Sequence, residues 1–281
     1  MGKKALLVGI NRYKIPGADL RGCVNDVKNM QAVLTQMYGF ASKDIAVLTD
    51  FAATSKAMAA AVSKLIRDAR KGDVLLLHYS GHGSNVPDAN GDEADRRDEI
   101  LCPTDLDWKK PFLDDWLRTT LDGLRAGVSL TVIMDCCHSG SITRVLVPPD
   151  APRIARYLPS PWDLVATESG RKLRGRVQGS LRASTTTARK KKDVVNVKIP
   201  ELLITGCRDT QTSADAHIGG AFNGALTYCL VETLKNAGGN ISYRKLHEQT
   251  LKRLKQGGFD QVPQLEGLGT KFDRPFFSPE P

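Results

Sequence analysis

Two short motifs carry the residues of this chain whose types and spacing could do chemistry. The first is YSGHGS at 79–84, and the second is DCCHSG at 135–140. Each follows a run of apolar residues typical of a buried strand, at 74–77 and 130–134. Ligand and catalytic groups of open α/β sheets gather at the C-terminal ends of the parallel strands. The motifs therefore predict an imidazole, His82, and a thiol above the same sheet edge.

A thiol held beside an imidazole makes a cysteine nucleophile with its own proton carrier. At its free pKa of about 8.5 a thiol is mostly protonated at neutral pH, and the thiolate is the reactive form. A nearby imidazole takes that proton and returns it to the departing amine. The distance along the chain between His82 and Cys137 is no obstacle, because parallel strands joined by a crossover lie side by side. We therefore predict a cysteine peptidase.

The composition is that of an ordinary soluble globular protein. Apolar residues make up 41% of the 281 positions and charged residues 25%. No apolar run approaches the roughly 18 residues of a membrane span. The six cysteines show no zinc-binding spacing. The first apolar run ends at Asn11 without a cleavage signature, so we expect a first strand, no signal peptide and a cytoplasmic, reducing location.

The net charge of +9 is local. The window 171–192 contains nine Lys or Arg and no Asp or Glu, and the rest of the chain is balanced. This distribution argues against nucleic-acid binding as the main function. A nucleic-acid binder that uses this window stays an alternative, and it would show strongly salt-dependent binding lost on deletion of 171–192.

Strands and helices alternate along most of the sequence. We expect strands at 3–10, 45–48, 74–79, 130–134 and 201–205, with extended pieces at 100–102 and 261–265. Helical periods occupy 23–38, 58–66, 114–125, 224–236 and 242–255. This order predicts an α/β sandwich of three layers, with a mainly parallel six-stranded central sheet and helices on both faces. We expect one domain over 1–281, in which 145–199 is a flexible basic insertion because it has no sustained period.

Three motifs together carry a family resemblance. YSGHGS, DCCHSGS and TGCRDTQTSAD (205–215) resemble those of a metacaspase, a caspase-like cysteine peptidase, over most of 1–270 apart from 145–199. The resemblance implies a caspase-like fold, with a large-subunit-like part at 1–144 and a small-subunit-like part at 200–281. It implies a dyad of His82 and Cys137 and favours Cys137 over Cys136 as nucleophile. It also implies an oxyanion site made by the backbone N–H groups of Gly83 and Cys137.

The resemblance also implies hydrolysis after Arg or Lys. Caspases proper select an acidic residue, whereas metacaspases resemble one another in having an acidic pocket. Asp26 and Asp135 match the pocket acids, and Cys23 and Ser80 match its walls. Two desolvated carboxylates would favour a guanidinium or ammonium partner. The alternative for both acids is structural, and for Asp26 it is stabilisation of a helix N-terminus.

A peptidase with such a pocket would find targets in its own basic window. We expect self-cleavage between about 171 and 192, with the targets Arg189, Lys190, Lys191 and Lys192. The alternative is a solvated loop that is never cut.

Calcium is the one cofactor that the resemblance raises. Three acids expected as ligands match Asp98, Asp114 and Asp115, but the fourth position holds Arg144. Calcium therefore either binds weakly or takes another ligand here. We expect protein or peptide substrates with Arg or Lys before the cut, no membrane partner and a monomer. The competing hypotheses are a catalytically silent caspase-like scaffold, although both dyad residues are present, and an amidase of another thiol type.

Overall fold

The computed structural model describes residues 1–280 except 89–96, 139–152, 164–201 and 209–210. Its centre is a six-stranded sheet in the order β12-β9-β7-β3-β1-β2. Five strands run parallel, and they are β1 (Lys3–Gly9), β2 (Ile45–Thr49), β3 (Val74–Ser80), β7 (Ser129–Asp135) and β9 (Leu202–Thr205). Only the edge strand β12 (Gln264–Glu266) is antiparallel, to β9. The mainly parallel central sheet expected from the sequence is confirmed.

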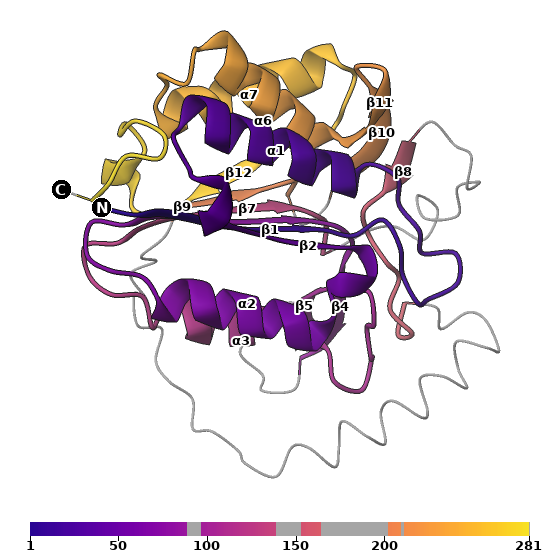
Figure 1. Cartoon of the computed structure of the whole chain (residues 1–281). Coiled ribbons are helices and arrows are strands. Elements are labelled where there is room, and N and C mark those ends of the chain that lie inside the picture. Colours follow the sequence, from indigo (N-terminus) through magenta and orange to yellow (C-terminus); the bar gives the residue numbers. More distant parts are fainter. Residues whose placement is uncertain (89–96, 139–152, 164–201, 209–210, 281) are drawn as a thin grey trace.

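Helices cover both faces of this sheet (Figure 1). One face carries α1 (Cys23–Met37), α6 (Ala225–Asn236) and α7 (Tyr243–Gln256), and the other carries α2 (Ser55–Arg67) and α3 (Asp114–Leu121). Every residue of β3 and β7 is buried, as expected for strands covered on both faces. Thr54 caps α2 and Ser242 caps α7, each accepting a hydrogen bond from a backbone N–H of the first turn. Short 3-10 turns occupy Ser42–Asp44, Asp50–Ala52 and Gly269–Lys271.

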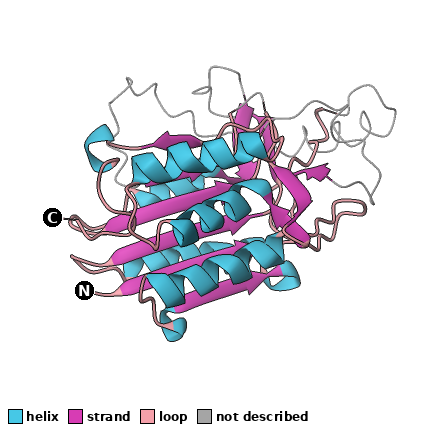
Figure 2. Cartoon of the chain, turned by 90° about the horizontal axis from the view of Figure 1, so that it is seen from above, coloured by secondary structure: helices cyan, strands magenta, loops and turns pink. Residues whose placement is uncertain are grey.

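Two small antiparallel sheets adjoin the central sheet, one on the side of α2 and α3 and the other near the C-terminal ends of the parallel strands (Figures 1 and 2). One contains β4 (Gly83–Pro87), β5 (Arg97–Leu101) and β6 (Phe112–Leu113). The other contains β8 (Arg153–Ala155), β10 (Ala214–Ile218) and β11 (Ala221–Gly224). Within 145–199, where the sequence indicated no regular structure, the structure thus has the strand β8. The sequence did not indicate β8 because a strand of three residues is too short to show a period. Its partner strand, β10, lies about 60 residues later in the chain.

The register of β3 and β7 sets the position of both chemical motifs. The two strands pair in parallel from Val74↔Ser129 to Ser80↔Asp135. His82 and Cys137 each follow the last paired residue of their strand by two positions. The strands therefore deliver the imidazole and the thiol to the same edge of the sheet.

Candidate active site

The backbones of the two motifs touch directly beyond the sheet edge. A Cβ atom placed on Gly83 would lie 2.1 Å from the carbonyl oxygen of Cys137. No side chain fits at that distance, so the close approach requires glycine at position 83. The residue after His82 is thus in contact with Cys137.

His82 is held in one orientation by groups from the loop that follows β1. Its Nε2 lies 2.8 Å from the carbonyl oxygen of Ala18. Because a carbonyl can only accept, Nε2 carries the hydrogen and Nδ1 has the lone pair. The backbone N–H of His82 donates to the hydroxyl of Tyr13 at 2.9 Å, and the two rings are 5.0 Å apart. Among the described residues Nδ1 has no hydrogen-bond partner, which leaves it available for proton exchange.

Burial keeps His82 neutral. It lowers the pKa of the imidazole to about 4, against the opposing effect of the hydrogen bond to Ala18. At pH 7 the ring is therefore an uncharged base.

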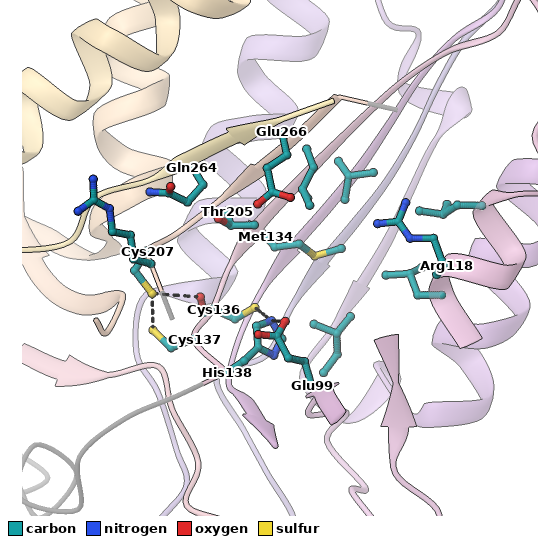
Figure 3. Close-up of a pocket in the computed structure, with 16 residues that line it drawn as sticks. Glu99, Arg118, Met134, Cys136, Cys137, His138, Thr205, Cys207, Gln264 and Glu266 are labelled. Carbon is teal, nitrogen blue, oxygen red and sulfur yellow. Dashed lines mark hydrogen bonds and ion pairs between the residues drawn. The ribbon is translucent and has the colours of Figure 1, made fainter. Parts of the chain in front are cut away.

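The thiol of Cys137 is buried among backbone and sulfur groups of the 206–213 segment. Its Sγ accepts a short hydrogen bond from the backbone N–H of Ser213 and lies 3.4 Å from the Sγ of Cys207 (Figure 3). Burial and the hydrogen bond with Cys207 raise the pKa of Cys137 well above its ordinary value. With the chain in this arrangement the thiol of Cys137 and the imidazole of His82 are both neutral, and their pairing as a dyad stays a prediction.

Cys136 has different surroundings. Its Sγ lies 3.6 Å from Nε2 of His138, which in turn is 3.8 Å from a carboxylate oxygen of Glu99. These groups line a cavity of about 250 Å³ between β7, β9, β12 and α3 (Figure 3). Burial raises the pKa of Cys136 well above its usual range. Neither cysteine is therefore a thiolate at pH 7 in this state, and the contacts rather than the pKa values separate the two.

Three buried carboxylates surround one guanidinium, that of Arg156. Asp26 on α1, Asp135 at the end of β7 and Asp215 on β10 all lie within 3.2 Å of the side chain of Arg156. All four side chains are fully buried. The acids expected at 26 and 135 thus lie in one buried cluster with a third acid that the sequence did not single out. We call this cluster the acidic pocket, and its role in substrate binding stays a prediction.

Both terminal nitrogens of the guanidinium, Nη1 and Nη2, have polar partners in the pocket. Nη2 of Arg156 donates to Asp26 at 2.7 Å and to Asp215 at 3.1 Å. Nη1 donates to the hydroxyl of Ser80 at 2.8 Å and lies 3.2 Å from a carboxylate oxygen of Asp135. A planar fork with several donors satisfies such a set of acceptors better than a point charge does.

The pKa values in the pocket follow from burial opposed by charge. Burial lowers the pKa of Arg156, but the charges of Asp135, Asp26 and Asp215 outweigh it and hold that pKa well above its ordinary value. Burial raises the pKa of Asp26 to about 7, with Arg156 opposing the rise. Cys23, predicted as a wall residue, is buried at the start of α1, and its thiol pKa is raised by burial and lowered by the charge of Arg156.

Gly224 closes the pocket with backbone alone. A Cβ at this position would lie 2.3 Å from both Nη1 of Arg156 and a carboxylate oxygen of Asp135. Its N–H donates to the carboxylate of Asp26 at 2.9 Å. Glycine is therefore required here for a guanidinium to fit.

The backbone carbonyl of Arg156 contacts both predicted oxyanion donors. Gly83 N–H donates to this oxygen at 3.0 Å and Cys137 N–H at 3.2 Å. Donors converging on one carbonyl oxygen next to a thiol have the geometry that stabilises a tetrahedral oxyanion. The two N–H groups predicted for this role therefore share one acceptor.

Other predicted residues lie elsewhere or outside the described part of the chain. Asp98 is buried in β5, and Asp114 and Asp115 begin α3. Arg144 and the self-cleavage targets, Arg189 to Lys192, fall in ranges 139–152 and 164–201, which are not described. Within the described residues no group of three or more His, Cys, Asp or Glu side chains could hold a metal ion. Calcium binding stays a prediction.

Several site residues escaped the sequence analysis. Arg156 lies in the segment expected to be a flexible insertion, and Ala18 contributes a main-chain carbonyl, for which no residue type is a signal. Asp215 had a signal, because it ends the TGCRDTQTSAD motif as Asp135 begins the DCCHSG motif. Gly224, the last residue of β11, had none.

The fold is that of a caspase. The structure aligns with Caspase-1 from Spodoptera frugiperda at a TM-score of 0.55 and 13% identity, covering 94% of this chain and 86% of that one. It also aligns with the crystal structure of a protein from Geobacter sulfurreducens at a TM-score of 0.73 and 30% identity over the whole of both chains. The caspase-like sandwich expected from the motifs is confirmed.

The sequence comparisons narrow this class to one family. A model of the metacaspase peptidase C14 domain matches residues 3–146. Metacaspase-1 from Coccidioides immitis is 37% identical over 291 aligned residues, covering 94% of this chain and 61% of that protein. Metacaspase-1 from Meyerozyma guilliermondii is 32% identical, covering 94% and 68%. The chain belongs to the metacaspase family of caspase-like cysteine peptidases.

Two further findings concern the length of the relatives and the membrane. Metacaspase-1A from Aspergillus fumigatus is 36% identical, and the chain spans only 61% of its length. Among the residues that the structure describes, none of the helices combines the length and apolar character needed to cross a bilayer.

Proposed function

We propose that this chain is a cysteine endopeptidase that cleaves peptide bonds after Arg or Lys, with Cys137 as nucleophile and His82 as acid and base. One observation carries the proposal. An arginine has its guanidinium among three carboxylates while its carbonyl oxygen accepts hydrogen bonds from the N–H groups of Gly83 and Cys137. A residue before a scissile bond needs both contacts at once.

The reaction follows from the groups at this site. The thiol of Cys137 transfers its proton to Nδ1 of His82 as Sγ attacks the substrate carbonyl, because both groups are neutral before the reaction. The developing oxyanion takes hydrogen bonds from the N–H groups of Gly83 and Cys137. The amine leaves with the proton held by His82, and water then hydrolyses the thioester and restores the thiol.

The Ala18 carbonyl has a positioning role in this scheme. By accepting from Nε2 it fixes the tautomer that leaves Nδ1 free, and it stabilises the imidazolium that forms during transfer. Because main-chain atoms supply the contact, no carboxylate is needed as a third member of the site.

The pocket supports a preference for Arg over Lys. Nη1 and Nη2 of a guanidinium meet separate acceptors on opposite sides, whereas an ammonium group reaches fewer of them. Calcium dependence and a monomeric state remain expectations based on the family resemblance, and a cytoplasmic location remains an expectation based on the sequence.

The test is hydrolysis of small fluorogenic peptides that end in Arg, Lys, Gln or Asp, with calcium or with a chelator. We expect turnover of the Arg and Lys peptides by the wild type and none by Cys137→Ala, with folding of the variant checked by circular dichroism. Preferred cleavage of the Asp peptide would overturn the pocket assignment. Equal turnover by Cys137→Ala would remove the proposed nucleophile.

A further inference from the structure

Residues 153–158 lie in the site as an extended peptide with contacts on both sides of one bond. On the N-terminal side, β8 pairs antiparallel with β10, where Ala155 faces Ala214 and Ile154 faces Asp215. The backbone N–H of Arg156 continues the ladder by donating to the carbonyl of Ser213 at 2.9 Å. An extended peptide that adds a strand to an existing sheet edge is a common mode of peptide recognition.

Arg156, the residue that follows β8, lies at the proposed reaction centre. The side chain of Arg156 fills the acidic pocket, and its carbonyl oxygen meets the N–H groups of Gly83 and Cys137. Every buried residue needs partners for its N–H and its carbonyl, so the identity of the partners is what matters here. Here the N–H, the carbonyl and the side chain of one residue all meet groups suited to a reacting residue.

The C-terminal side of the same bond is held as well. Tyr157 forms a bridge with Gly83, and the N–H of Leu158 donates to the carbonyl of Gly83 at 2.9 Å. The hydroxyl of Ser84 donates to the carbonyl of Leu158 at 2.6 Å. The backbone on both sides of the Arg156–Tyr157 bond is therefore held by hydrogen bonds, one of them from the backbone N–H of Cys137 at 3.2 Å.

The geometry points to Arg156–Tyr157 as a self-cleavage bond of this chain, with β8 occupying the substrate cleft until the bond is cut. This inference rests on the proposed function and names a substrate for it. Sγ of Cys137 bonds to the carbonyl carbon of Arg156, the C–N bond to Tyr157 breaks, and the new amine takes its proton from His82. Water then releases a carboxylate at Arg156 and the free thiol.

The consequence is a change in access to the pocket. While the bond is intact, Arg156 excludes any other arginine from the three carboxylates, and it has no exposed surface itself. Cutting separates β8 and Arg156 from Tyr157 and Leu158, which stay bonded to β4. The pocket is then open to exchange with arginine in other chains.

The bond differs from the one that basic composition favours. The run Arg189–Lys192 lies outside the described residues, so nothing in the structure relates it to the site. Arg153 provides a matched control, because it lies in the same strand but is exposed and donates to the carbonyls of Gly257 and Gly258 rather than to pocket acids.

The experiment is N-terminal sequencing and intact mass measurement of the purified full chain after incubation. We expect fragments 1–156 and 157–281 from the wild type and from Arg153→Gln, and none from Cys137→Ala. Arg156→Gln should give at least about tenfold less of this fragment, and Arg156→Lys an intermediate amount. Because β8 lies in the substrate cleft of the same molecule, cleavage is intramolecular. The fraction cut in a given time should therefore not depend on protein concentration.

A second measurement covers misfolding of Arg156→Gln, which leaves buried acids without their guanidinium. A synthetic peptide of residues 153–160 carrying Arg153→Gln should be cut by the processed wild type only between Arg156 and Tyr157. Wild type that hydrolyses Arg peptides but stays intact, or is cut only after 189–192, would overturn this inference and leave the proposed function standing. Absence of both activities would overturn both.

Discussion

Removing one charge from the pocket tests how the chain recognises arginine. Asp215 is the acid to change, because Oδ1 lies 3.1 Å from Nη2 of Arg156 and the side chain is fully buried. The same carboxylate accepts from the backbone N–H groups of Arg21 at 2.7 Å and Gly22 at 2.9 Å. Asp215→Asn keeps the shape and one acceptor oxygen but removes the negative charge.

The expected loss follows from one charge-assisted hydrogen bond. Such a bond contributes about 1.5–3 kcal/mol, and 1.4 kcal/mol corresponds to a factor of ten. We therefore expect kcat/KM for Arg peptides to fall roughly 10- to 150-fold. Asp26 and Asp135 remain, which is why recognition should weaken and not vanish.

The assay is the ratio of kcat/KM for a peptide ending in Arg to that for the matched peptide ending in Gln. This ratio does not depend on the fraction of the protein that is folded. It is therefore unaffected if Asp215→Asn weakens the hydrogen bonds from Arg21 and Gly22 and lowers stability. Asp73→Asn is the control, since it removes an acid bonded to Lys4 at 2.6 Å, next to β3 but at the opposite end of the sheet. An Arg-to-Gln ratio unchanged in Asp215→Asn would refute the three-acid pocket.

Three other predictions concern the thiols, the substrate and the stability. Cys136→Ala should keep most of the activity that Cys137→Ala abolishes, and equal losses in peptide hydrolysis would contradict the assignment. Arg peptides should exceed Lys peptides by about tenfold in kcat/KM, because an ammonium group loses one of the separated contacts; a preference for Lys would contradict the fork geometry. His78 and His82 have folded pKa values lowered to about 4 by burial, from an ordinary value of 6.5. The unfolded state therefore binds more protons between these values, and the free energy of unfolding of the Cys137→Ala chain should fall as pH drops from about 6.5 to 4. Asp26, whose folded pKa is raised to about 7, opposes one of the two histidines over this range. His78→Gln should therefore remove most of the net slope in urea titrations, and an unchanged slope would show that the buried imidazole does not cause it.

The sequence predicted the parts of the fold whose signals are local. Continuous apolar runs marked β3 and β7, because a strand that is covered on both faces is apolar throughout. Apolar residues at helical spacing marked α1, because a helix that is covered on one face is apolar on that face only. The same runs placed His82 and Cys137 at the sheet edge. The helix predicted to end near Arg125 ends at Leu121, since Gly123 and the turn around it interrupt the period.

The unpredicted parts depend on contacts between distant segments. The role of Arg156 becomes visible only when β8 is paired with β10 and the acids of α1, β7 and β10 lie around it. These elements are far apart in the sequence, so no local pattern could indicate the contacts. The carbonyl of Ala18 could belong to any residue type. The pocket predicted from Asp26 and Asp135 was therefore incomplete. Asp215 had a signal in its motif that the sequence analysis did not use, whereas Gly224 required coordinates.

The central claim is that an acidic pocket presents an arginine carbonyl to Cys137. Its most direct test is labelling of the processed protein with a peptidyl chloromethyl ketone ending in Arg, followed by mass mapping of the adduct. The account predicts a single adduct on Cys137, lost in Cys137→Ala, retained in Cys136→Ala and suppressed by excess Arg peptide. Labelling confined to Cys136 or Cys207, or faster labelling by the equivalent probe ending in Asp, would contradict it.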